Sequence, residues 1–141
     1  MLLAGCGGGH KMSGDERAAA AALQGYLTAF SHHDYTGACA RLTDAAKLRI
    51  ARRSRAPTLQ LNKVGCPAQL AALLGTVPPP QRNAVLGVVA DAEVESVKIT
   101  GETATAEVKA TFRGHSQTQP VTLQRVGTTW EVDATPNARQ E

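Results

Sequence analysis

Hydrophobic residues recur at helical spacing near the start of the chain. Leu23, Tyr26, Leu27 and Phe30 follow one another at intervals of three, one and three positions, which places their side chains on one face of a helix. The pattern predicts an amphipathic helix over residues 15–31, with this face buried.

Further helices are marked by residues that suit a first turn. A side-chain oxygen just before a helix accepts hydrogen bonds from free backbone N–H groups, and proline is favoured in the first turn. Such residues are, in chain order, Ser13 or Asp15, Asp34, Thr43 or Asp44, and Pro67. We therefore expect three short helices: from Tyr35 to about Leu42, from Asp44 with Ala45, Leu48 and Ala51 facing inward, and from Pro67 to Leu74. Residues 76–80, which contain three prolines, are expected to form a stiff connector.

After residue 83 the hydrophobic period changes to two. Alternation of apolar and polar residues predicts strands over residues 94–99, 103–112, 121–126 and 129–134, joined by glycine-containing turns. In the last strand Asp133 has the parity of Glu131, opposite Trp130, so it is expected to face water. Helices followed by an antiparallel meander predict an α+β fold, in which the helices pack on a curved sheet. We expect one such domain over residues 15–135 and a disordered tail over residues 136–141.

Three segments carry a resemblance to a known family. They are Leu-Gln-Gly-Tyr-Leu-Thr-Ala-Phe at 23–30, Asp-Tyr-Thr-Gly-Ala-Cys at 34–39 and Gly-Thr-Thr-Trp-Glu-Val-Asp at 127–133. In this order they resemble the cone-shaped domain of nuclear transport factor two, ketosteroid isomerase and the SnoaL-like proteins. The chain is especially similar to lipoproteins that carry this domain outside the cell in high-GC Gram-positive bacteria. The resemblance implies a pocket between helix and sheet, but the shared motifs are structural and none is catalytic.

The first residues suggest a lipid anchor. Leu3-Ala4-Gly5-Cys6 resembles the lipobox of bacterial lipoproteins, in which the cysteine receives the lipid. We interpret residues 1–5 as the remnant of a signal peptide, whose basic and apolar regions would lie upstream. Residues 6–14 then form the lipidated Cys6 and a flexible glycine-rich tether. The expected location is the extracytoplasmic face of the cell membrane.

The remaining cysteines form an even pair. If Cys6 carries lipid, Cys39 and Cys66 are left, and an oxidising compartment favours a disulfide between them. Two buried free thiols are the alternative.

The chain is mildly basic, with a formal net charge of +3. Much of the excess lies in one run, which could contact anionic lipid or cell-wall polymer or could simply be a solvated helix face. The run consists of Lys47, Arg49, Arg52, Arg53 and Arg55.

Candidate chemistry is sparse. Aromatic residues make up only 4% of the chain, which argues against a surface that stacks bases or sugars. Tyr26, Phe30 and Trp130 are the candidates for lining a pocket. The polar cluster from His32 to Tyr35 is more typical of a solvated helix end than of a metal site. We identify no catalytic residue and no metal ligand.

The sequence therefore favours a non-catalytic, membrane-anchored lipoprotein that binds a small ligand or a protein. We expect no cofactor and no nucleic acid partner, and either a monomer or a homodimer. The first alternative is an enzyme of the ketosteroid-isomerase or SnoaL-like type acting on a small apolar substrate. The second is a basic surface that docks on anionic lipid or polymer.

Overall fold

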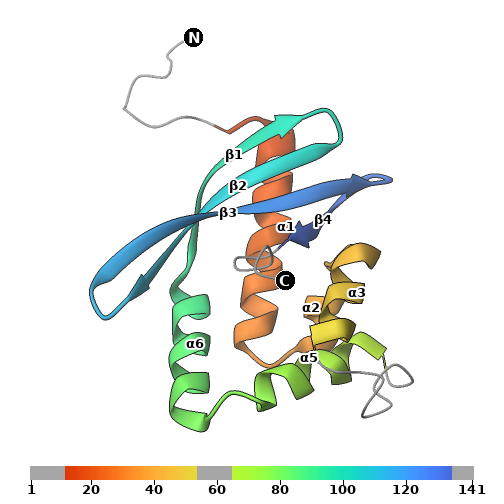
Figure 1. Ribbon diagram of the computed structural model, residues 1–141. Coiled ribbons are helices and arrows are strands. Elements are labelled where there is room, and N and C mark those ends of the chain that lie inside the picture. The colour runs from red at the N-terminus through yellow and green to blue at the C-terminus, as the bar shows by residue number, and fades with distance from the viewer. Residues whose placement is uncertain (1–11, 54–64, 135–141) are drawn as a thin grey trace.

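The computed structural model describes residues 12–53 and 65–134, which form an α+β structure (Figure 1). In these two segments, five helices precede one four-stranded antiparallel sheet. The helices are α1 (Gly14–Ser31), α2 (Tyr35–Cys39), α3 (Asp44–Arg53), α5 (Gly65–Gly75) and α6 (Pro79–Asp91). The strands are β1 (Glu93–Thr100), β2 (Thr103–Phe112), β3 (His115–Val126) and β4 (Thr129–Ala134), hydrogen-bonded in chain order. The predicted α+β class is confirmed. The predicted signal remnant, most of the tether and the C-terminal tail lie outside the described residues.

Helix α1 forms the centre of the structure. Ser13 caps it reciprocally: its hydroxyl accepts a hydrogen bond from Glu16 N at 3.2 Å, and its backbone N–H donates to the Glu16 carboxylate at 2.8 Å. The buried face of the helix contains Ala19, Leu23, Tyr26 and Leu27 and packs against β1, β2 and β4 (Figure 1). Phe30, the last residue of the predicted face, is only half-buried.

The inner face of the sheet provides the other half of the core. Ala104 and Ala106 on β2 are fully buried, and their small side chains allow a close approach to neighbouring elements. Larger side chains on β3 and β4 fill the remaining space, and Val121, Leu123 and Val132 are all 0% exposed. Burial of this alternating face is what fixes the strand register.

The chain between α2 and α3 runs along the free edge of β4. Val132 N donates to Arg41 O at 2.7 Å, and Thr43 N donates to Val132 O at 3.0 Å. Leu42 and Val132 thereby form a parallel bridge. This pairing covers part of the β4 edge and fixes where α3 begins.

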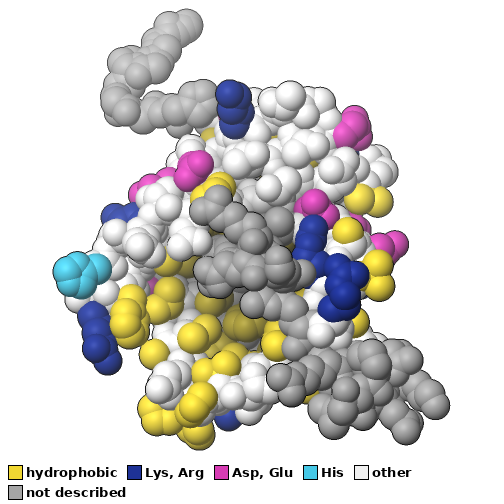
Figure 2. All heavy atoms as spheres, viewed as in Figure 1, with side chains coloured by type: hydrophobic (Ala, Val, Ile, Leu, Met, Phe, Trp, Pro, Cys, Tyr) yellow, Lys and Arg dark blue, Asp and Glu magenta, His cyan; other side chains and the backbone are white. Residues whose placement is uncertain are grey.

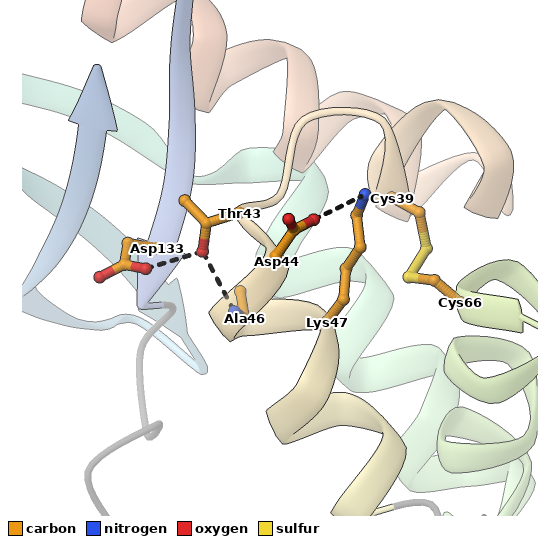
Figure 3. A network of polar contacts seen from close by, with 7 residues as sticks. All are labelled: Cys39, Thr43, Asp44, Ala46, Lys47, Cys66 and Asp133. Atoms are coloured by element: carbon orange, nitrogen blue, oxygen red, sulfur yellow. Dashed lines mark hydrogen bonds and ion pairs between the residues drawn. A yellow bond between two sulfur atoms is a disulfide. The ribbon is translucent and has the colours of Figure 1, made fainter. Parts of the chain in front are cut away.

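A disulfide joins α2 to α5. Cys39 and Cys66 are bonded, with their Cα atoms 6.1 Å apart (Figure 3), as the cysteine count predicted. The main contacts of α5 are with α2 and α3, whereas α6 packs on α1 and β2. The bridge therefore holds a helix that has little contact with the sheet.

Helix α6 was not predicted. Its sequence begins with prolines and contains Gly87 and several valines, which have low intrinsic helix propensity. Pro78 lies just before the helix, and Pro79 and Pro80 occupy its first turn. Backbone N–H groups in the first turn form no hydrogen bond within the helix, so the N–H that proline lacks is not needed there. The last two residues of the predicted stiff connector, Pro79 and Pro80, therefore belong to α6.

Strand β3 is also longer than predicted, because it begins at His115 and its residues 115–124 pair with β2. Pro120 lies within it. Strand β4 pairs only with residues 122–126, so the first half of β3 has an open edge on which a proline is tolerated.

The predicted inward face of α3 is wrong at two of its three residues, since of these only Ala51 is half-buried. Leu48 is 60% exposed and Ala45 is exposed, while Ala46 is buried and Ile50 is half-buried. The pairing of residues 41–43 with β4 sets the rotation of this short helix, and the hydrophobic pattern alone did not reveal that constraint.

Candidate functional site

A large cavity lies between the helices and the half of the β2–β3 hairpin that contains its turn. Its volume is about 1130 Å³, and its walls come from α1, α3, α5, α6, β2 and β3. Figure 2 shows hydrophobic side chains gathered over α6 and the end of the hairpin. Representative apolar lining residues, one or two from each wall, are Phe30, Ile50, Leu70, Val89, Val108 and Phe112. We refer to this space as the apolar cavity.

Helix α6 leaves much of its apolar surface uncovered along this cavity. None of its residues, all of which the structure describes, is buried. Val85 is 41% exposed, and Val88 and Val89 are half-buried cavity residues. An apolar hollow of this kind, with a few polar groups around it, is typical of a site for a small ligand.

Asp133 is one of those polar groups, which corrects the prediction that it faces water. Its side chain is half-buried at the cavity, where Thr43 Oγ1 donates a hydrogen bond to Asp133 Oδ1 at 2.7 Å (Figure 3). The same hydroxyl accepts from Ala46 N at 3.1 Å and so caps α3. The cause is a bulge in β4: Val132 pairs with Leu123 and Ala134 with Thr122, so Asp133 is an extra residue. A bulge interrupts the alternation of side chains and turns the extra residue from the face that simple parity predicts.

The described side chains of the predicted basic run lie in different surroundings. Arg49 lines the apolar cavity and donates from Nη1 to Asp133 O at 2.6 Å. Lys47 is half-buried and lies 3.9 Å from the Asp44 carboxylate (Figure 3). Arg52 is exposed, whereas the side chains of Arg53 and Arg55 lie outside the described residues. Of the three cations whose side chains the structure describes, Lys47 and Arg49 thus have partners within the protein.

Tyr26 and Phe30 both line the apolar cavity, with ring centroids 6.2 Å apart. Burial raises the pKa of the Tyr26 phenol from 10.0 to about 12, because the charged phenolate would lose its hydration. At neutral pH Tyr26 is therefore a neutral hydroxyl at the cavity wall and can donate or accept a hydrogen bond.

Trp130, the third predicted pocket residue, lies elsewhere. It borders a second, open hollow of about 910 Å³ between α1, α2 and β4, together with Gly25 and Arg41. The Arg125 guanidinium lies 4.7 Å from the Trp130 ring centroid and 3.3 Å from the Asp15 carboxylate. Trp130 thus helps to fasten the start of α1 to the sheet and does not share a site with Tyr26 and Phe30.

The polar cluster after α1 forms a helix connection. Asp34 Oδ1 accepts from Gly37 N at 2.9 Å and caps α2, while His33 Nδ1 lies 3.1 Å from the Tyr35 hydroxyl. Within residues 12–53 and 65–134, no group of three or more His, Cys, Asp or Glu side chains is arranged to hold a metal ion.

The anchor prediction rests on residues outside the described part of the chain, because Cys6 lies there. No helix within the described residues is long and apolar enough to cross a membrane.

Two cavity residues that the sequence reasoning missed lie at the tip of the β2–β3 hairpin. Arg113 and Gly114 form a two-residue turn, both with positive φ, between the paired residues Phe112 and His115. Arg113 and His115 line the apolar cavity. The available signal was the Arg-Gly pair between two alternating runs, which is typical of a tight hairpin, but the second run has few apolar residues before Val121.

Comparison of the chain with protein-family models, curated proteins and solved structures finds no match.

Proposed function

We propose that this protein is an extracytoplasmic lipoprotein, anchored to the membrane through Cys6, whose apolar cavity binds a small apolar ligand without transforming it. The observation that carries the proposal is the cavity itself: about 1130 Å³, lined mainly by aliphatic and aromatic side chains from four helices and the sheet. We also propose that the domain belongs to the cone-shaped family of nuclear transport factor two. Its helices packed on a four-stranded meander are compatible with that family.

Three features support the location. Leu3-Ala4-Gly5-Cys6 has the pattern of a lipobox. The disulfide between Cys39 and Cys66 is of the kind that persists in oxidising compartments outside the cytosol. The residues after Cys6 include three consecutive glycines, which suit a flexible tether.

Ligand binding is tested with a neutral apolar fluorophore, N-phenyl-1-naphthylamine, added to the Cys6→Ser protein. We expect saturable enhancement of fluorescence. Ala110→Trp should abolish it, because Ala110 is half-buried on the cavity side of β2. Thr105→Trp, on the exposed face of the same strand, is the matched control and should bind normally. No saturable binding, or equal binding by the Ala110→Trp variant, would refute the proposal.

The anchor is tested by intact mass. The protein is expressed from its own gene with the upstream DNA, recovered from the membrane fraction, and alkylated before and after reduction. We expect a chain that begins at Cys6 and carries acyl groups, with Cys39 and Cys66 alkylated only after reduction. An unmodified chain beginning at Met1 would contradict the anchor.

An enzyme of the ketosteroid-isomerase type is a second candidate, favoured by one observation. Asp133 and Tyr26 line the same cavity, so a carboxylate that could act as a base and a neutral hydroxyl donor are both present. Incubation with a β,γ-unsaturated cyclic ketone and measurement of the conjugated product by ultraviolet absorbance tests this. Turnover that Asp133→Asn abolishes would establish catalysis, and its absence leaves binding as the function.

A further inference from the structure

We propose that the ligand of the apolar cavity is a single-chain anionic amphiphile of the fatty-acid class, with its carboxylate at the tip of the β2–β3 hairpin beside Arg113. This inference rests on the proposed ligand-binding function and specifies its ligand.

The charged groups around the cavity differ in whether they have a partner within the described part of the protein. Asp133 is the one carboxylate among the described lining residues, and it already accepts a hydrogen bond from Thr43. Arg49 donates to the Asp133 carbonyl. Arg113 has no carboxylate partner among the described residues; its guanidinium lies 5.0 Å from the Phe112 ring centroid. A cation without an acidic partner at the rim of an apolar cavity is complementary to a ligand with an acidic head and an apolar body.

The hairpin tip matches such a ligand in shape as well as in charge. Phe112 is 47% exposed, lines the cavity and lies beneath the Arg113 guanidinium. An apolar ring and a cation are thus adjacent at the rim, where the chain of an amphiphile would meet its head. The nearby His115 ring offers a further hydrogen-bond donor to a carboxylate. Figure 2 shows the basic and histidine side chains at this tip next to the hydrophobic ones.

The backbone at Arg113 is a second, independent observation. Its φ is 53° and that of Gly114 is 79°, so the turn requires positive φ at both central positions. Asn, Asp and Gly suit the first of these positions, whereas a long side chain is disfavoured there. An arginine in this conformation weakens the turn, and a role in binding explains its presence.

The occupant is a free single-chain carboxylate because of the size of the cavity and the form of the cation. The cavity volume, about 1130 Å³, is slightly above the usual range of small-ligand sites, roughly 300–1000 Å³, so the cavity has room for an extended alkyl chain. One exposed guanidinium forms paired hydrogen bonds with one carboxylate.

The test measures displacement of N-phenyl-1-naphthylamine by dodecanoate, decanoate, dodecanol and dodecyltrimethylammonium. The ionic amphiphiles are kept below their micelle concentrations and dodecanol below its solubility limit. Dodecanoate should bind most tightly and the cationic amphiphile most weakly. Each methylene added between decanoate and dodecanoate should tighten binding about fourfold, as expected for an apolar site. If dodecanol or the cationic amphiphile competes as well as dodecanoate, this inference is overturned while the proposed function stands. If neither the fluorophore nor any of these amphiphiles binds, the proposed function itself fails.

Variants locate the head group. Arg113→Asn should weaken dodecanoate about three- to tenfold, as loss of an exposed charge-assisted hydrogen bond predicts, and leave dodecanol unchanged. Lys109→Gln is the matched control, since Lys109 lies nearby on β2 but does not line the cavity and its loss also removes one positive charge. Arg113→Asn should also raise the thermal midpoint, because asparagine suits the turn. Unchanged dodecanoate affinity in Arg113→Asn, or an equal loss in Lys109→Gln, would refute the role of Arg113.

Discussion

Reduction of the Cys39–Cys66 disulfide should destabilise the protein strongly. The bridged residues are separated by 27 positions, and the chain-entropy relation gives about 3.5 kcal/mol at 25 °C for a loop of this size. The effect should be large because α5 has few other attachments: it packs mainly on α2 and α3. For a chain of this length, a loss of about 3.5 kcal/mol lowers the thermal midpoint by roughly 10–15 °C.

Thermal unfolding followed by circular dichroism measures this change. The Cys6→Ser protein is heated with and without dithiothreitol, and the Cys39→Ala/Cys66→Ala variant is heated under the same conditions. The reductant should lower the midpoint of the first protein to near that of the variant and leave the variant unaffected. A midpoint shift of less than about 3 °C on verified reduction of both thiols would refute the reasoning, because the loop-closure estimate would then be wrong by several-fold.

Three further predictions concern single side chains. Thr43→Val should reduce the free energy of unfolding in urea by about 2 kcal/mol, since one hydroxyl both caps α3 and bonds Asp133; a change below about 0.5 kcal/mol would contradict this role. Gly25→Ala should raise the free energy of unfolding by about 0.5–1 kcal/mol, because alanine suits a helix interior better than glycine. The new Cβ would lie 2.5 Å from Arg41 Cζ, but the Arg41 side chain is exposed and can move away. A loss of stability that Arg41→Ala rescues would show that the Arg41 side chain cannot move. The pKa of Tyr26 is raised from 10.0 to about 12 in the folded protein. The resulting contribution to stability is fully present below pH 10 and is lost between pH 10 and 12, because the phenol ionises first in the unfolded chain. Tyr26→Phe should flatten that part of the stability–pH curve, and an identical slope in both proteins would rule out this ionisation.

The sequence predicts best those elements whose hydrophobic period is unambiguous. The burial of Leu23, Tyr26 and Leu27 on α1 is as predicted, although Phe30 is only half-buried. The predicted alternation on β2 holds for Ala104, Ala106 and Val108, which are buried, whereas Phe112 at the end of the strand is exposed. Capping chemistry was equally informative, since Ser13 and Asp34 do cap α1 and α2. In each case the signal lies within a few residues, and no distant contact is needed to read it.

The wrong predictions occur where a contact with a distant part of the chain determines which way a side chain points. The rotation of α3 depends on the pairing of residues 41–43 with β4, ninety positions away along the chain. Asp133 points toward the cavity because of a bulge that only the register of β3 and β4 reveals. Alternation assumes a regular strand, so one inserted residue reverses its prediction for every side chain beyond that point.

The apolar cavity could not be predicted from the sequence, because it depends on distant contacts and on a helix without a hydrophobic period. This affects how its ligand should be sought. Its walls come from four helices and the sheet, and one of these helices is α6, whose apolar residues have no clear helical period. A helix that packs fully on a core needs a periodic face, because its other side meets water. Helix α6 lacks such a face and has no buried residue, so packing on the core does not account for its apolar side chains. Binding measurements should therefore include α6 variants, and Val88→Asp is informative because it places a charge in the cavity wall without removing a core side chain. If the cavity binds an apolar chain, this change should reduce affinity far more than it reduces stability; if α6 serves only the fold, the order of the two effects will be reversed.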